Sequence, residues 1–133
     1  MSPVGGYVYF QGNRQSEPTI TRLFSPEWNA IGDSCLTFFF AVPFAEVANT
    51  TLTVYQQRSS SDSAEPLWRM TSGPKRAALP IGTSALAATW TAAQVPVPAA
   101  GPGIVVIEGS SSSGVVALDD IRLKRHACLG KSF

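Results

Sequence analysis

Short runs of alternating apolar and polar residues, separated by turn residues, constrain this chain most. Thr51–Gln57 alternates with Leu52 and Val54 on one face, and Tyr7–Gln11 and Thr19–Phe24 follow the same period. Neighbouring side chains of a strand point to opposite faces of its sheet, so each run predicts a strand with one buried face. Helical periodicity is almost absent, because Pro80 and Gly82 interrupt the alanine-rich stretch between residues 77 and 93. We therefore expect an all-β fold.

The run Cys35–Val42 differs from the others because both of its faces are apolar. Phe38 and Phe40 fall on one face and Phe39 on the other, which predicts a strand at the centre of a sandwich. Turn residues are frequent, with ten prolines and eleven glycines. The sequence predicts about eight strands: Tyr7–Gln11, Thr19–Phe24, Cys35–Val42, Thr51–Gln57, Leu67–Met70, Trp90–Val97, Gly103–Glu108 and Val115–Leu123. This pattern is typical of an antiparallel β-sandwich of jelly-roll or immunoglobulin-like kind.

Composition limits the classes of partner. The 133 residues suit one domain, 44% of them are hydrophobic, and no linker or internal repeat divides the chain. Ten basic and nine acidic residues leave a net charge of +1, so nothing marks the chain for nucleic acid or for an anionic membrane. The apolar runs are too short to span a bilayer. The first residues lack the features of a secretory signal, as they would in a mature secreted protein or a fragment.

Two cysteines, Cys35 and Cys128, lie 128 − 35 = 93 positions apart. They are either two buried free thiols or one long-range disulfide, which would contribute about 4–5 kcal/mol in the loop-entropy view. Asn49-Thr50-Thr51 is a sequon that predicts N-glycosylation of Asn49. The sequon favours the disulfide, because both features belong to proteins outside the cytosol.

No catalytic set emerges from the motifs. Gly32-Asp33-Ser34 resembles the nucleophile block of a hydrolase family, but Cys35 is inserted before the leucine that should follow directly. His126 is the only histidine and lacks a carboxylate at a suitable spacing, whereas a triad needs a base oriented by a third group. A lone histidine without a Cys-x-x-Cys pair does not support a zinc site either. We expect no enzyme, and a turn before a strand at Asp33-Ser34.

Asp119 and Asp120 are adjacent in an otherwise apolar run. Because neighbours in a regular strand face opposite ways, one of them should point into an apolar layer and would need a partner there. The pair either contributes to a hard-cation site, with oxygen ligands that suit Ca²⁺, or one Asp caps a loop or pairs with an arginine such as Arg22 or Arg69. No other carboxylate nearby in the sequence completes a cage.

Several blocks, taken in order, resemble a MAM domain, the extracellular module named for meprin, neuropilin and receptor tyrosine phosphatase mu. Each block is short, but their order and spacing from residue 6 to residue 128 make the match specific. The blocks are Gly6-Tyr-Val-Tyr9, Leu23-Phe-Ser-Pro26, Cys35-Leu-Thr-Phe-Phe39, Leu52-Thr-Val-Tyr55, Leu67-Trp68, Trp90 through Pro98, Ile107-Glu-Gly109, Ala117-Leu-Asp-Asp-Ile121 and Cys128.

The resemblance implies an antiparallel jelly-roll β-sandwich of the concanavalin or galactose-binding-like, two-sheet kind over residues 5–128, with 129–133 as a tail. It implies a non-catalytic adhesion or interaction module, extracellular or at the cell surface, within a larger receptor, membrane-anchored or secreted protein. Its partners would be proteins, bound homophilically or heterophilically, and any membrane contact would come through the parent chain. It further implies a Cys35–Cys128 disulfide and a structural Ca²⁺ near Asp119 and Asp120.

The front of the chain departs from the family pattern. No Cys-Phe-Glu strand precedes Gly5, so we expect a domain that is incomplete at its N-terminus. Two alternatives remain: a small hydrolase using Ser34 and His126, and a carbohydrate-binding jelly roll. The latter would stack sugars on exposed aromatic side chains, with Trp28, Trp68, Tyr7 and Tyr9 as candidates.

Overall fold

The computed structural model describes residues 8–11, 19–42, 50–60, 63–72, 90–111 and 115–129. These ranges contain nine strands and no helix, and accordingly no helix in them could cross a membrane. The strands are β1 (Val8–Gln11), β2 (Thr19–Phe24), β3 (Trp28–Ala30), β4 (Ser34–Ala41), β5 (Thr50–Arg58), β6 (Ala64–Ser72), β7 (Thr91–Val97), β8 (Gly101–Ser111) and β9 (Val115–Lys124).

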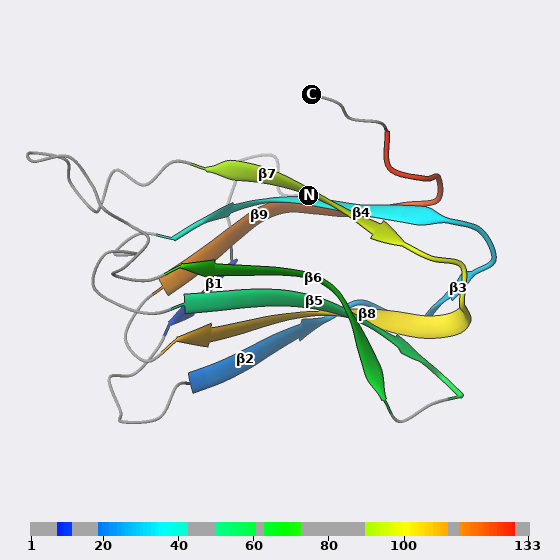
Figure 1. Cartoon of the computed structure of the whole chain (residues 1–133), viewed down its shortest axis with the longest axis horizontal. Coiled ribbons are helices and arrows are strands. Elements are labelled where there is room, and N and C mark those ends of the chain that lie inside the picture. Colours follow the sequence, from blue (N-terminus) through cyan, green and yellow to red (C-terminus); the bar gives the residue numbers. More distant parts are fainter. Residues whose placement is uncertain are drawn as a thin grey trace, which may run out of the picture.

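Two antiparallel sheets form the two layers of a sandwich (Figure 1). The four-stranded sheet has the order β1-β9-β4-β7, and the five-stranded sheet has the order β2-β8-β5-β6 with β3 beside β8. Within these sheets β5 pairs with β6, β4 with β7, β2 with β8 and β1 with β9. Such concentric pairing around one hairpin is the arrangement of a rolled-up jelly roll. The predicted fold class is confirmed.

Each of the eight predicted strands has a counterpart in the structure, but two details differ. β3 was not predicted, because three residues are too few to display a period. β6 begins three residues earlier than expected, at Ala64, and includes Pro66. Proline lacks the N–H needed on one side of a strand, and both β6 and β7, which contains Pro96, are outer strands of their sheets. Most of the alanine-rich stretch lies outside the described ranges.

The core lies between the two sheets. The Phe38 ring meets Trp68 edge-on with ring centroids 5.6 Å apart. Each fully buried large apolar side chain stabilises the fold by about 1.5–3 kcal/mol relative to exposure. Gln56 also points inward, and its Nε2 donates to the carbonyl oxygen of Pro98 at 2.9 Å, which satisfies a buried polar group. The largest fully buried apolar side chains are Phe38, Leu52, Leu118, Val54, Val95, Val97 and Val116.

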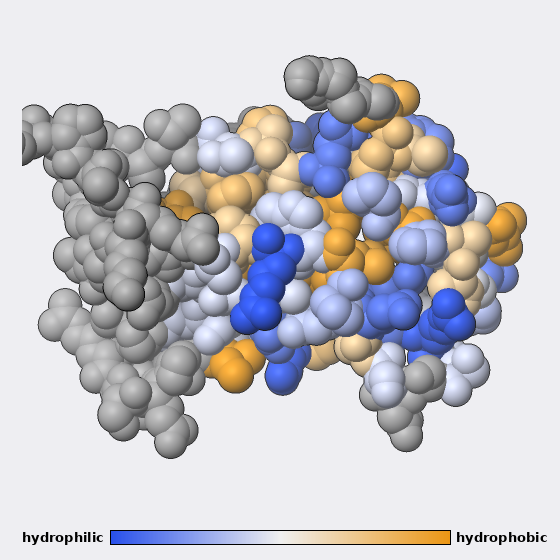
Figure 2. Space-filling model, viewed as in Figure 1, coloured by the Kyte–Doolittle hydropathy of each residue, from blue (hydrophilic) through white to orange (hydrophobic). Residues whose placement is uncertain are grey.

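β4 occupies the interior of its sheet, between β9 and β7, as its apolar sequence predicted. Its two faces differ, however. Phe38 is 1% exposed and lies in the core, whereas Phe39 is 42% exposed on the outer face. The outer face is therefore only partly buried, since Cys35 and Ala41 on it are 1% and 6% exposed but Phe39 is not covered by any described layer. On the face of the molecule drawn in Figure 2, hydrophobic residues form separate groups among hydrophilic ones.

Candidate functional site

The two cysteines form a disulfide. The sulfur atoms of Cys35 and Cys128 are 2.01 Å apart and the Cα atoms 4.7 Å apart. Cys35 lies near the start of β4 and is 1% exposed, while Cys128 follows the end of β9. The bond that the family resemblance implied therefore ties the segment after the last strand to the middle of the four-stranded sheet.

The aspartate pair lies at a bulge in β9. Thr37 and Phe39 of β4 are opposite Arg122 and Asp119, so three steps along β9 match two along β4. Asp120 has a φ of 54°, in the left-handed region that accommodates the extra residue. Both aspartates are half-buried rather than buried.

The bulge reverses the alternation of β9. Leu118 is fully buried before the bulge, and Leu123 packs against the same core after it, although five positions separate them. In a regular strand an odd separation would place these two side chains on opposite faces. The prediction that one aspartate points into the apolar layer is therefore wrong.

Both carboxylates have local partners. The Asp120 N–H donates to Asp119 Oδ1 at 2.8 Å, and Arg122 Nε lies 2.8 Å from Asp120 Oδ1. An arginine pairing was one alternative, but the arginine is Arg122 rather than Arg22 or Arg69. Among the described residues no three or more His, Cys, Asp or Glu side chains gather as metal ligands, whereas Ca²⁺ takes six to eight oxygens. The donors described here are too few, and the Ca²⁺ assignment stays a prediction that a calcium titration of the melting temperature would test.

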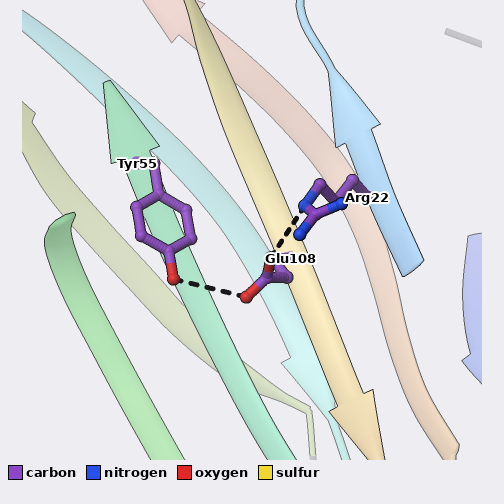
Figure 3. A network of polar contacts seen from close by, with 3 residues as sticks. All are labelled: Arg22, Tyr55 and Glu108. Atoms are coloured by element: carbon purple, nitrogen blue, oxygen red, sulfur yellow. Dashed lines mark hydrogen bonds and ion pairs between the residues drawn. The ribbon is translucent and has the colours of Figure 1, made fainter. Parts of the chain in front are cut away.

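Another acidic residue, Glu108, forms a network across the five-stranded sheet (Figure 3). Glu108 of β8 has its Oε2 2.8 Å from Arg22 Nε on β2, and its Oε1 accepts from the Tyr55 hydroxyl on β5 at 3.3 Å. The network therefore links three adjacent strands. A single Glu in the apolar run of β8 was the sequence signal for it, but alternation alone could not supply the partners.

The hydrolase residues do not meet. Ser34 is the first residue of β4 and is 2% exposed, and its hydroxyl donates to the carbonyl oxygen of Gly32 at 3.4 Å. His126 is exposed, with Nδ1 2.9 Å from the carbonyl oxygen of Ala127. In the described structure neither side chain bonds to the other, so the nucleophile–base contact that a triad needs is not formed. The expected strand follows, but it begins at Ser34 itself, so Ser34 is not part of a turn.

Two of the four predicted sugar-stacking aromatics, Trp28 and Trp68, lie against protein. Trp68 packs edge-on against Phe38 and Phe40 at 5.6 and 5.7 Å between centroids. Trp28 packs against the core and carries the Arg125 guanidinium 5.5 Å from its ring centroid. Tyr7, the Tyr9 side chain and the predicted glycosylation site Asn49 lie outside the described residues.

A groove between β2 and the C-terminal half of β9 was not predicted. Its volume is about 440 Å³, and Arg125 is the one charged side chain among its described lining residues. The apolar pair Ile121 and Leu123 at the end of β9 was the only sequence signal for the groove. It was not enough, because the groove depends on which strands flank these residues. The lining consists of Leu23, Phe24, Ser25, Pro26, Trp28, Leu36, Val105, Ile107, Ile121, Leu123 and Arg125.

Comparison with known families assigns the chain. The profile of the MAM domain, meprin/A5/mu, matches residues 1–129. The chain belongs to the MAM domain family. The MAM domain-containing glycosylphosphatidylinositol anchor proteins 1 of Rattus norvegicus and Mus musculus are each 28% identical to it over 132 residues, which cover 96% of this chain and 12% of the relative. This MAM chain thus spans about an eighth of the length of those relatives.

Two solved bacterial domains have a similar fold. The K1 cleaved adhesin domain of Lys-gingipain from Porphyromonas gingivalis superposes with a TM-score of 0.68 at 22% identity, covering 91% of this chain and 75% of that one. The K3 domain of the same protein gives 0.67 at 20% identity, with 89% and 72% covered. At this level of identity the likeness concerns the β-sandwich fold alone.

Proposed function

We propose that this MAM chain is a non-catalytic interaction module of a larger extracellular or cell-surface protein, and that it binds protein partners. The observation that carries the proposal is the disulfide-closed MAM sandwich itself, because structural disulfides persist in oxidising compartments outside the cytosol. The rodent relatives, whose name includes a glycosylphosphatidylinositol anchor, support a place at the cell surface.

The surface chemistry supports a protein partner over a carbohydrate. Phe24 and Ile121 are 58% and 37% exposed beside the same groove, and grouped exposed apolar residues mark interaction sites. Trp28 and Trp68, two of the four aromatics expected to stack on sugars, pack against the core instead. A carbohydrate-binding module is therefore the less supported alternative.

Beads coated with the chain test this function. We expect them either to aggregate with one another or to bind cells in a way that trypsin treatment of the cells abolishes. Beads coated with reduced and alkylated chain serve as the unfolded control. The proposal fails if coated beads neither aggregate nor bind cells, or if free sugars abolish binding and a glycan array identifies the ligand.

A further inference from the structure

Among the described strands, the C-terminal half of β9 is paired on one side only. β1 pairs with Val115–Leu118 only, whereas β9 continues to Lys124 with β4 on its other side. Of the strands that the structure describes, none pairs with residues 119–124 on the side away from β4. The backbone N–H and C=O groups of such an edge can pair with another extended chain.

The apolar groove opens beside this edge. Ile121 and Leu123 of β9 form one wall, and Leu23 and Phe24 of β2 form the other. β2 is itself the outer strand of the five-stranded sheet, so among the described strands both sheets end beside the groove. The volume of about 440 Å³ falls within the range of about 300–1,000 Å³ found for ligand sites. A strand added to β9 would point alternate side chains into this space.

The charge at the groove is positive. The Arg125 guanidinium rests over the Trp28 ring, 5.5 Å from its centroid. The ion pairs of the described residues join Arg22 to Glu108 and Arg122 to Asp120, and they leave Arg125 without a carboxylate. Lys124 precedes it in the sequence. A ligand that fits both the groove and this cation is apolar in its body and carries a carboxylate.

We propose that the groove binds an extended segment of a partner protein, which adds a strand to this edge of β9. The segment places alternate apolar side chains between Leu23 and Leu123, and an acidic side chain against Arg125. The backbone edge favours a polypeptide over a fatty acid, because only a polypeptide can pair with its N–H and C=O groups. This inference rests on the proposed function and names a surface and partner chemistry for it.

Fluorescence anisotropy with synthetic peptides tests the groove directly. The probe is an extended peptide of about six residues with valine and threonine alternating and a glutamate at one end. One matched peptide has lysine in place of glutamate, and another has N-methylated backbone amides that cannot donate. We expect saturable binding of the first peptide, weakened about fivefold by the lysine exchange and about tenfold by N-methylation.

Three variants of the chain locate the binding. Ile121→Lys places a charge in the wall of the groove, and we expect it to weaken peptide binding about tenfold. Ile31→Lys is the matched control, since Ile31 is 82% exposed and does not line the groove. Arg125→Glu should reverse the preference from the glutamate peptide to the lysine peptide. Melting curves identify any variant that fails to fold. If Ile121→Lys does not fold, the reversed peptide preference of Arg125→Glu still tests the groove.

Four outcomes overturn the inference. They are no peptide binding, equal binding of the N-methylated peptide, decanoate binding without peptide binding, and peptide binding only after residues 1–7, which precede β1, are deleted. The last would mean that this chain fills its own groove. Bead assays with Ile121→Lys separate the two proposals. If beads coated with this variant still aggregate or bind cells although the variant no longer binds the peptide, the groove is not the partner site and the interaction function stands.

Discussion

Cys35, near the start of β4, is bonded to Cys128, which lies beyond the end of β9. The two cysteines are 93 positions apart in the sequence. The bond joins β4 to the segment after the last strand of the sandwich. Arg125, which lines the groove, lies between the end of β9 and this bond.

Replacing both cysteines, in Cys35→Ser with Cys128→Ser, should lower the free energy of unfolding by about 4–5 kcal/mol, because the open unfolded chain gains loop entropy. Urea titration followed by tryptophan fluorescence measures the change. Adding reductant to the double variant is the control, since it should have no further effect. A loss below about 1 kcal/mol would mean that the bond contributes little to the native sandwich.

Phe38 and Phe39 are adjacent in β4 and offer a matched pair of substitutions. Phe38 is 1% exposed and packs against Trp68, whereas Phe39 is 42% exposed on the outer face. We expect Phe38→Ala to cost about 3–5 kcal/mol, since it leaves a cavity between the sheets, and Phe39→Ala to cost about 1 kcal/mol or less. Thermal unfolding of the two variants tests this. Equal costs would place both rings in comparable environments and contradict the assigned orientation of β4.

The alternation of residues was enough to predict the fold class and the eight longer strands, because sheet faces and turns are local properties. The alternation could not predict features that depend on the register between paired strands. The bulge at Asp120 comes from pairing with β4, and it overturned the inference that one of the two carboxylates points into the apolar layer. The groove likewise depends on which strands flank Ile121 and Leu123 in space, which no pattern within β9 reveals. The two cysteines left the disulfide as one of two interpretations, the sequon favoured it, and the family resemblance implied it.

Gly103 lies at a close approach between β8 and β5. A Cβ on this residue would clash with the backbone carbonyl oxygen of Gln57, and it would lie 3.1 Å from the Cα of Arg58. Because backbone atoms cannot move aside cheaply, we expect Gly103→Ala to destabilise the fold by about 1–3 kcal/mol. Gly32→Ala is the control, since nothing lies within 4 Å of its added Cβ. Melting temperatures of the two variants measure the contrast, and an unchanged value for Gly103→Ala would contradict the register of β8 on β5.

The bulge at Asp120 can be tested by comparing two substitutions. Asp120→Ala and Asp120→Gly both remove the ion pair with Arg122, so their difference isolates the backbone. Glycine tolerates the left-handed φ of 54°, whereas a side chain costs about 1–2 kcal/mol there. We therefore expect Asp120→Gly to be more stable than Asp120→Ala by about 1 kcal/mol, as measured by urea unfolding. If the alanine variant were the more stable one, residue 120 would adopt ordinary strand geometry, and the reversal of faces along β9 would need another cause.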